Sequence, residues 1–178
     1  MEAARRHLVV DSPIGPLTLV AQGQHLTCVY MSDHQHMPDP ERFGPTVDPF
    51  TADLPADDVL ARTAEQLDEY FAGDRQEFDI ELDTGSGTEF QRTVWAALRE
   101  IPYGERVSYA ELAGRIGRPT AFRAVGLANG RNPISIIVPC HRVVGSAGSL
   151  TGYGGGVERK QQLLELEAKY RHTESELF

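Results

Sequence analysis

Cys140 and His141 are adjacent in the sequence, and together they could do covalent chemistry. A thiolate is a strong nucleophile, but an ordinary cysteine is mostly protonated near neutral pH. A neighbouring imidazole can accept the thiol proton and so activate the sulfur. The pair alone is weak evidence, because a buried structural cysteine beside a chance histidine has the same sequence. The surrounding residues must decide between these two interpretations.

The segment before the cysteine should position it. An apolar run over residues 134–138 predicts a buried strand, and Pro139 then turns the chain into Cys140. Asn132, followed by a proline, is typical of a turn that precedes this strand. A glycine-rich stretch over 152–156 follows and predicts a loop. We therefore expect the cysteine at the end of a buried element, with a loop nearby.

Two short helices are predicted upstream of the cysteine. Ser108 with Glu111 three residues later is typical of a capping box at the start of the first helix. Residues 117–120 predict a tight turn, and a second helix is expected from Ala121 to about Ala128. Helix, short turn with glycine, helix is the helix-turn-helix pattern, although many helical hairpins share it.

The overall pattern predicts an α/β protein of two domains. A small N-terminal α/β domain over 1–85 should hold short strands, an acidic surface loop over 32–59, a helix from Val59 to Phe71 and a strand over 78–82. A mainly helical C-terminal domain over 86–178 should carry the helix-turn-helix and the cysteine. Its first helix is predicted from the spacing of Phe90, Val94, Trp95, Leu98 and Ile101.

Charge is unevenly distributed along the 178 residues, whose net charge is -9. Residues 1–91 hold 5 Lys and Arg against 18 Asp and Glu, a net of -13. Residues 92–160 hold 10 against 4, a net of +6, and residues 161–178 hold 2 against 4. The basic middle could face an anionic partner such as nucleic acid, with chance variation along the chain as the alternative.

Composition excludes several classes of protein. No apolar run is long enough to cross a membrane, and the first residues do not resemble a secretory signal. Two cysteines do not make a disulfide framework, so we expect a cytoplasmic protein with free thiols. Cys28 is interpreted as a small buried apolar residue. We expect no metal, because Cys28 has only scattered histidines around it, namely His25, His34 and His36.

Several motifs, in this order along the chain, resemble the O6-alkylguanine-DNA alkyltransferase family. Around the cysteine they are Asn132-Pro133, Pro139-Cys140-His141-Arg142-Val143 and Gly152-Tyr153-Gly154-Gly155-Gly156. The likeness extends to Ser108-Tyr109, Arg123-Ala124-Val125-Gly126 and Leu163-Leu164-Glu165-Leu166-Glu167, and it is close over residues 88–168. Asp11-Ser12-Pro13-Ile14-Gly15 and Tyr70-Phe71-Ala72-Gly73 also fit the family's N-terminal domain.

The resemblance implies a repair reaction. A monomer without a cofactor would move an alkyl group from O6-alkylguanine, and from O4-alkylthymine, in double-stranded DNA to its own Cys140, once per molecule. His141 would draw the thiol proton through a water, and Glu167 would orient His141 in the manner of a triad. Asn132 would brace the turn that carries the cysteine. Tyr109 would hydrogen-bond the flipped base and donate a proton to it.

The resemblance also implies how DNA would be held. The damaged base lies inside the duplex and must be extruded, and Arg123 would fill the gap that it leaves. The other expected DNA contacts are Ala124, Ala128 and Arg131. The expected base pocket is formed by Ser135, Val143, Tyr153 and Gly154. Some relatives carry a proline at the position of Ser135, which leaves the tolerance for bulky alkyl groups open.

Other functions stay open from the residues alone. A helix-turn-helix regulator would bind DNA and give Cys140 no chemical role. A cysteine hydrolase would use the same Cys-His pair, but no second feature supports it. An alkyltransferase-like protein without activity lacks the acceptor cysteine, so Cys140 argues against it.

Overall fold

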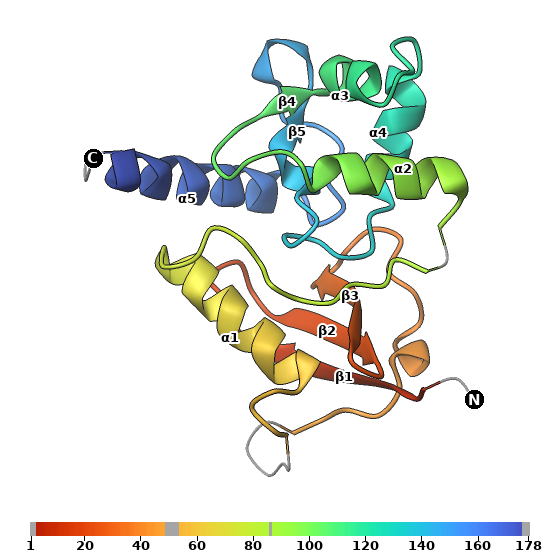
Figure 1. Cartoon of the computed structure of the whole chain (residues 1–178), viewed down its shortest axis with the longest axis vertical. Coiled ribbons are helices and arrows are strands. Elements are labelled where there is room, and N and C mark those ends of the chain that lie inside the picture. The colour runs from red at the N-terminus through yellow and green to blue at the C-terminus, as the bar shows by residue number, and fades with distance from the viewer. Residues whose placement is uncertain (1–2, 49–53, 86, 176–178) are drawn as a thin grey trace. The chain divides into compact units, whose positions relative to one another are not determined.

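The computed structural model describes residues 3–48, 54–85 and 87–175. The chain forms two compact units, Met1–Gly85 (unit 1) and Ser86–Phe178 (unit 2), which Figure 1 shows in red to yellow-green and in green to blue. The predicted class, α/β with a small sheet domain and a mainly helical second domain, is confirmed. No helix in the described ranges is long and apolar enough to cross a membrane.

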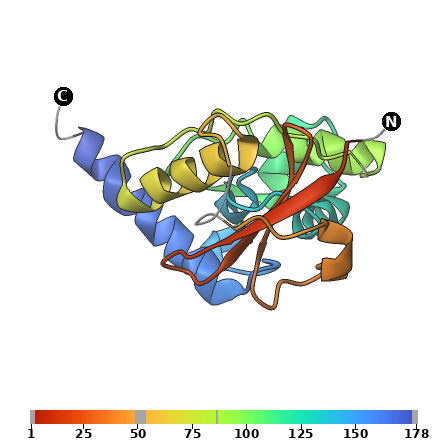
Figure 2. The ribbon, with the colours of Figure 1, turned by 90° about the horizontal axis from the view of Figure 1, so that it is seen from below.

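Unit 1 is a three-stranded antiparallel sheet with one long helix against it (Figure 2). The strands β1 (Arg5–Val10), β2 (Leu17–Gln22) and β3 (His25–Met31) are paired in chain order. Only two residues join β2 to β3, and Gly23 has a φ of +61° there, a left-handed conformation that glycine adopts without steric cost. α1 (Val59–Ala72) contacts all three strands.

The predicted helix in unit 1 is confirmed, and its ends are capped locally. The Asp58 carboxylate accepts a hydrogen bond from the Leu60 N–H at 2.9 Å and pairs with Arg6 at 2.8 Å. Burial would raise the pKa of Asp58, but the hydrogen bonds from Arg6 and Leu60 outweigh it and lower that pKa. Gly73, with a φ of +84°, ends the helix. Asp58 therefore links α1 to the first strand.

The strand predicted over residues 78–82 is wrong. Only Leu82 forms a bridge, to Leu26 of β3, with hydrogen bonds of 2.9 Å from the Leu26 N–H to Glu81 O and from the Asp83 N–H to Leu26 O. The alternating pattern arises because this segment runs along the sheet edge and buries Ile80. The alternation of apolar and polar residues indicates that one side of a segment is buried. It does not require that segment to pair as a strand.

The segment predicted as an acidic surface loop, 32–59, is largely exposed where it is described, and residues 49–53 lie outside the described residues. It contains a short 3-10 helix, η1 (Pro40–Phe43), and Val59 already belongs to α1. The Phe43 side chain is 2% exposed and packs with Tyr30, with ring centroids 5.9 Å apart. The loop is therefore attached to the sheet by this aromatic side chain and by backbone hydrogen bonds between His7 of β1 and residues 45 and 47, at 3.0 and 2.7 Å.

Unit 2 places its helices around two very short parallel strands (Figure 1). The helices are α2 (Glu89–Leu98), α3 (Tyr109–Arg115), α4 (Phe122–Gly130) and α5 (Val157–Ser175), with the 3-10 turns η2 (Cys140–Arg142) and η3 (Ser146–Gly148). The strands are β4 (Val107–Ser108) and β5 (Val143–Val144), paired in parallel. β5 directly follows η2, so the strand pair fixes one end of the cysteine segment.

The predicted helix-turn-helix is present as α3 and α4. The Ser108 hydroxyl accepts a hydrogen bond from the Glu111 N–H at 3.0 Å and so caps α3 as expected. Gly117, with a φ of +76°, begins the turn into α4. Leu112 of α3 and Val125 of α4 are fully buried, and α2 contacts both helices. One face of α4 is therefore committed to the core.

The buried strand predicted over residues 134–138 is wrong. The segment is buried, but it folds as a turn in which the Val138 N–H donates to Ile134 O at 3.0 Å and the Ile137 N–H donates to Ser135 O at 2.8 Å. Ile136 has a φ of +73°, which is rare for a β-branched residue. An apolar run indicates burial, and it cannot tell an extended backbone from a buried turn.

Candidate active site

The turn before Cys140 is held by Asn132. Its side-chain amide donates to Val138 O at 2.8 Å, and its Oδ1 accepts from the Ile134 N–H at 3.0 Å. The side chain therefore replaces the strand pairing that this buried backbone would otherwise need. Cys140 begins η2 directly after this turn, and it is 4% exposed. Its carbonyl accepts from the Asn129 amide of α4 at 3.3 Å.

Glu167 of α5 joins the two residues that follow the cysteine. Its Oε2 lies 2.6 Å from His141 Nε2, and Arg142 donates to both carboxylate oxygens, at 2.8 Å to Oε1 and 3.1 Å to Oε2. The Gly104 N–H also donates to Oε1, at 3.1 Å. Arg142 is further held by Ile101 O at 2.7 Å. The carboxylate thus accepts hydrogen bonds from two separate segments of unit 2.

These contacts determine the protonation of the site. Burial would raise the pKa of Glu167, but His141 and the Arg142 guanidinium outweigh it and hold that pKa well below its usual range. An ionised carboxylate only accepts hydrogen bonds, so His141 Nε2 must donate to it. In the neutral imidazole, Nδ1 then carries the lone pair. Nδ1 is buried and has no hydrogen-bond partner among the described residues.

The thiol is protonated at rest. Burial raises the pKa of Cys140, and a hydrogen bond from Asn132 and the charge of Lys160 only partly oppose this effect. Burial also lowers the pKa of the Lys160 ammonium to about 8, partly offset by the charge of Cys140. A thiol in this environment reacts only after a base removes its proton.

Tyr109 and Lys160 meet at one backbone carbonyl. The Tyr109 hydroxyl donates to Thr151 O at 3.0 Å, and Lys160 Nζ donates to the same oxygen at 2.9 Å. Lys160 Nζ also lies 5.9 Å from the centre of the Tyr109 ring. Burial raises the pKa of Tyr109, so its hydroxyl stays protonated. These two side chains connect α3 and α5 to the loop that contains Tyr153.

The residues expected to line a base pocket are all buried. Ser135, Val143, Tyr153 and Gly154 belong to the two segments on either side of the cysteine. The Ser135 and Tyr153 hydroxyls have no hydrogen-bond partner among the described residues. Two buried donor groups without protein partners suit a site that receives a polar molecule.

The residues expected to contact DNA do not all face the same way. Arg123, Ala124 and Arg131 are exposed on α4 or at its end. The expectation that Ala128 contacts DNA is corrected, because its side chain is 3% exposed. Its carbonyl accepts a hydrogen bond from Trp95 Nε1 of α2 at 2.8 Å. Its side chain faces the core, since the same side of α4 buries Val125.

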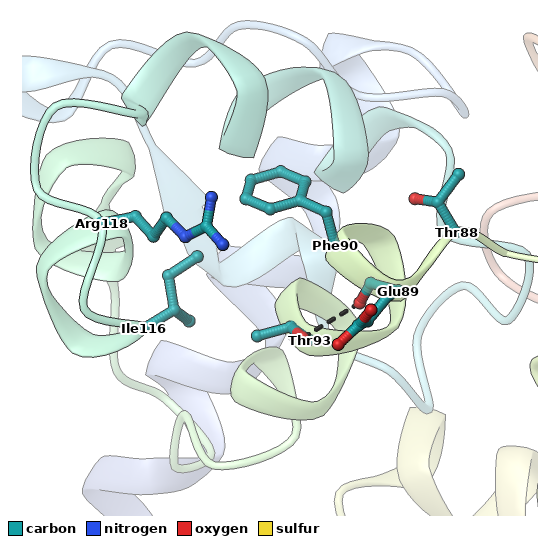
Figure 3. Close-up of a pocket in the computed structure, with 6 residues that line it drawn as sticks. All are labelled: Thr88, Glu89, Phe90, Thr93, Ile116 and Arg118. Carbon is teal, nitrogen blue, oxygen red and sulfur yellow. Dashed lines mark hydrogen bonds between the residues drawn. The ribbon is translucent and has the colours of Figure 1, made fainter.

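A separate surface hollow of about 430 Å³ lies on unit 2 (Figure 3). It is lined by Thr88, Glu89, Phe90, Thr93, Ile116 and Arg118. The Arg118 guanidinium points at the Phe90 ring, 5.9 Å from its centre. None of the lining residues belongs to the cysteine site, so this hollow is distinct from it.

Sequence reasoning gave no role to Arg142 and Lys160. Arg142 stands inside the cysteine motif, and a charged residue directly before the apolar pair Val143-Val144 is the signal that could have marked it. Lys160 is fully buried. The many charged residues of its helix would instead predict that the lysine side chain is exposed to solvent. Cys28 is half-buried against a cluster of Val20, Tyr30 and Phe43. No group of three His, Cys, Asp or Glu in the described ranges is arranged to hold a metal ion.

Comparisons with known proteins identify the family. Models of two domains match the chain: 6-O-methylguanine DNA methyltransferase, ribonuclease-like domain, over residues 6–84, and 6-O-methylguanine DNA methyltransferase, DNA binding domain, over residues 89–169. A methylated-DNA–protein-cysteine methyltransferase from Mycolicibacterium paratuberculosis is 54% identical over 169 residues, which cover 95% of this chain and 96% of that protein. The chain belongs to the 6-O-methylguanine DNA methyltransferase family.

More distant members and solved structures agree with this assignment. A family member from Methanosarcina acetivorans is 44% identical and covers 90% of this chain and 97% of its own length. The crystal structure of Mycobacterium tuberculosis OGT in complex with DNA superposes with a TM-score of 0.81 at 51% identity, over 93% of this chain and 94% of that one. The O6-methylguanine-DNA methyltransferase from Pyrococcus kodakaraensis, at 20% identity and a TM-score of 0.52, shares the fold.

Proposed function

We propose that this protein repairs double-stranded DNA by transferring an alkyl group from O6-alkylguanine, and from O4-alkylthymine, to the sulfur of Cys140. The observation that carries this proposal is the 2.6 Å contact between Glu167 and His141, which leaves the unpartnered Nδ1 of the residue that follows Cys140 as the proposed base. A relative that is 54% identical is named a methylated-DNA–protein-cysteine methyltransferase, which supports the same reaction here.

The first step activates the sulfur. His141 Nδ1 takes the Cys140 proton through a water, and the imidazolium that forms is stabilised by the Glu167 carboxylate behind it. Asn132 keeps the turn in place, and its side-chain amide lowers the pKa of Cys140, which favours the thiolate. Arg142 keeps Glu167 ionised throughout, so the proton does not pass on to that carboxylate.

The second step is a displacement at the alkyl carbon. The sulfur forms a bond to that carbon while the bond between the carbon and O6 breaks, and its electron pair stays with the guanine. The guanine gains a proton and leaves as a neutral base, and the protonated Tyr109 hydroxyl is the proposed donor. The base must therefore replace Thr151 O as the partner of Tyr109. The thioether product is stable, so each molecule reacts once.

Extrusion requires a pocket for the flipped base and a side chain that fills the space left in the base stack. The buried hydroxyls of Ser135 and Tyr153 are proposed to face the base. Arg123, exposed on α4, is proposed to enter the stack where the nucleotide leaves, with Ala124 and Arg131 beside it. No cofactor takes part. We also propose that the protein acts as a monomer in the cytoplasm, where free thiols such as Cys28 and Cys140 persist.

Intact-mass measurement tests this function. The full chain is mixed with a duplex that carries one O6-methylguanine, and the mass of the protein is measured. We expect a gain of one methyl per chain, located at Cys140 by peptide mapping, and no gain with Cys140→Ser. Cys28→Ser is the matched control and should gain the methyl as the wild type does. DNA binding without any mass gain would instead favour a helix-turn-helix regulator.

A further inference from the structure

Asn129, near the end of α4, is a buried amide that uses only part of its hydrogen-bonding capacity. The residue is 1% exposed, and its Nδ2 donates to Cys140 O at 3.3 Å. Its Oδ1 is also buried and has no hydrogen-bond partner among the described residues. A buried amide oxygen without a partner destabilises a fold, so an apolar side chain of similar size would suit this position better if it only filled space. Packing alone therefore does not account for an asparagine here.

The oxygen that Asn129 holds belongs to the peptide between the proposed nucleophile and the proposed base. Cys140 O also accepts the Val143 N–H, so Asn129 supplies the second of the two hydrogen bonds that a carbonyl oxygen can accept. The bond from Val143 closes the 3-10 turn and lies within the same segment. The bond from Asn129 instead comes from a different element, α4, and it therefore fixes the plane of this peptide relative to the rest of unit 2.

The two ends of the Cys140–His141 pair are anchored separately. Glu167 of α5 holds the His141 ring at 2.6 Å, and Asn132 holds the turn that leads into Cys140. The backbone N–H of Asn132 in turn donates to Asn129 O at 3.3 Å, so both asparagines belong to one turn of the chain. In the described part of the chain, the hydrogen bonds of Glu167 and Asn132 do not reach the peptide between the pair. Rotation of that peptide would move the sulfur relative to the imidazole while both anchors stay intact.

We infer that Asn129 is a positioning residue for the proposed reaction, because it holds the Cys140–His141 peptide against α4 and so keeps the sulfur aligned with His141 Nδ1. Proton transfer requires the donor and the acceptor to be aligned, directly or through one water, so a small rotation slows it. Asn129 contacts the backbone of Cys140 and acts through it. This inference rests on the proposed function and adds a positioning residue to it.

Two variants separate positioning from packing. Asn129→Leu keeps a side chain of similar size and removes the amide. Cys140 O retains the Val143 N–H and the unpartnered amide oxygen disappears, so the free energy of unfolding should stay unchanged or rise. Trp95→Phe is the matched control, because it removes the 2.8 Å hydrogen bond from Trp95 Nε1 to Ala128 O, on the residue before Asn129. Each variant thus loses one buried hydrogen bond at the end of α4, and only Asn129→Leu frees the Cys140 peptide.

The experiment measures single-turnover methyl transfer from a duplex with one O6-methylguanine at increasing protein excess and at a series of pH values. We expect the maximal rate of Asn129→Leu to be about tenfold lower than that of the wild type at about pH 7. The difference should shrink as the pH rises, because the thiol then loses its proton without help from His141. The half-saturating protein concentration should not change. Trp95→Phe should react as the wild type does at every pH.

The groups that titrate or carry charge around the Cys140–His141 pair are the same in all three proteins, so the ratio of rates at each pH isolates Asn129. They are Glu167 and Lys160 of α5, Arg142 of η2, Tyr109 of α3 and Tyr153 of the following loop.

The outcomes separate this inference from the function on which it rests. If the wild type transfers the methyl group and Asn129→Leu does so equally fast, the inference is overturned and the proposed function stands. A deficit of the same size at every pH, or one that Trp95→Phe shares, would assign Asn129 to the fold and also overturn the inference. If the wild type transfers no methyl group, both are overturned. Urea unfolding checks that Asn129→Leu is folded, and Asn129→Ala, which removes the amide without adding apolar bulk, takes its place if it is not.

Discussion

Glu167 accepts hydrogen bonds from His141 and Arg142 at the same time, at 2.6 Å and at 2.8 to 3.1 Å. One carboxylate therefore orients the proposed base and neutralises a buried guanidinium. Orientation of His141 depends on the position of the Glu167 side chain, whereas neutralisation of Arg142 depends on its negative charge. Substitutions at Glu167 should reveal both.

Glu167→Gln should slow alkyl transfer on the order of a hundredfold, because a neutral amide no longer stabilises the imidazolium of His141. Single-turnover rates with duplex DNA and with free O6-benzylguanine measure the effect, and both should fall. Glu165→Gln is the matched control, since this exposed carboxylate of the same helix accepts a hydrogen bond from Gln161 at 2.9 Å and lies outside the cysteine site. A normal rate for Glu167→Gln would remove the carboxylate from the mechanism.

The same substitution should destabilise the protein by about 3 to 5 kcal/mol near neutral pH, because it leaves Arg142 buried without a counter-charge. The loss should depend on pH. The folded pKa of Glu167 is lowered, so its contribution to stability is complete above the ordinary value of 4.5 and is lost as the pH falls towards the folded pKa. Urea unfolding at about pH 6 and about pH 3.5 should show the gap between wild type and Glu167→Gln narrowing in acid. A gap that widens in acid would contradict the ionised carboxylate.

Cys140→Ser should bind damaged duplex DNA and transfer nothing measurable, and the wild type should transfer one alkyl group per molecule. The reason is that a thioether is stable and no other residue of the site offers a step that cleaves it. Titration of the wild type with excess alkylated duplex should end at one equivalent of repaired base. Repeated turnover would disprove the self-alkylation mechanism.

Arg123→Ala should slow transfer from duplex DNA far more than transfer from a free base, because only the duplex requires extrusion. Loss of an unstacking aid of about 2 kcal/mol corresponds to roughly a 30-fold slower reaction with the duplex. The measurement is a pair of single-turnover rates, with O6-benzylguanine as the free base. Because Ser135 leaves the tolerance of the pocket for bulky alkyl groups open, a smaller O6-alkylguanine is the alternative free base. Equal slowing of both reactions would place Arg123 in the chemistry or in the fold.

The features that the sequence predicted well depend on residues close together in the chain. The cap of α3 joins Ser108 to the backbone of Glu111, three residues away, and the helical spacing of α1 repeats within each turn. The cysteine motif is a short contiguous segment, so neighbouring residues alone carry the resemblance to a family. These features need only local backbone geometry.

Tertiary packing decided the features that sequence patterns did not predict, because burial and long-range pairing depend on residues far apart in the chain. Residues 134–138 are buried as predicted, yet Asn132 turns them into a bend because it supplies the hydrogen bonds that a neighbouring strand would have supplied. Arg142 is paired with a carboxylate only because α5 brings Glu167, 25 residues further along the chain, against it. Which side of α4 packs inward decided that Ala128 is hidden and Leu127 is exposed. The sequence by itself predicted the family and the proposed reacting residues, and the packing of distant segments decided which side chains around them are buried, paired or exposed.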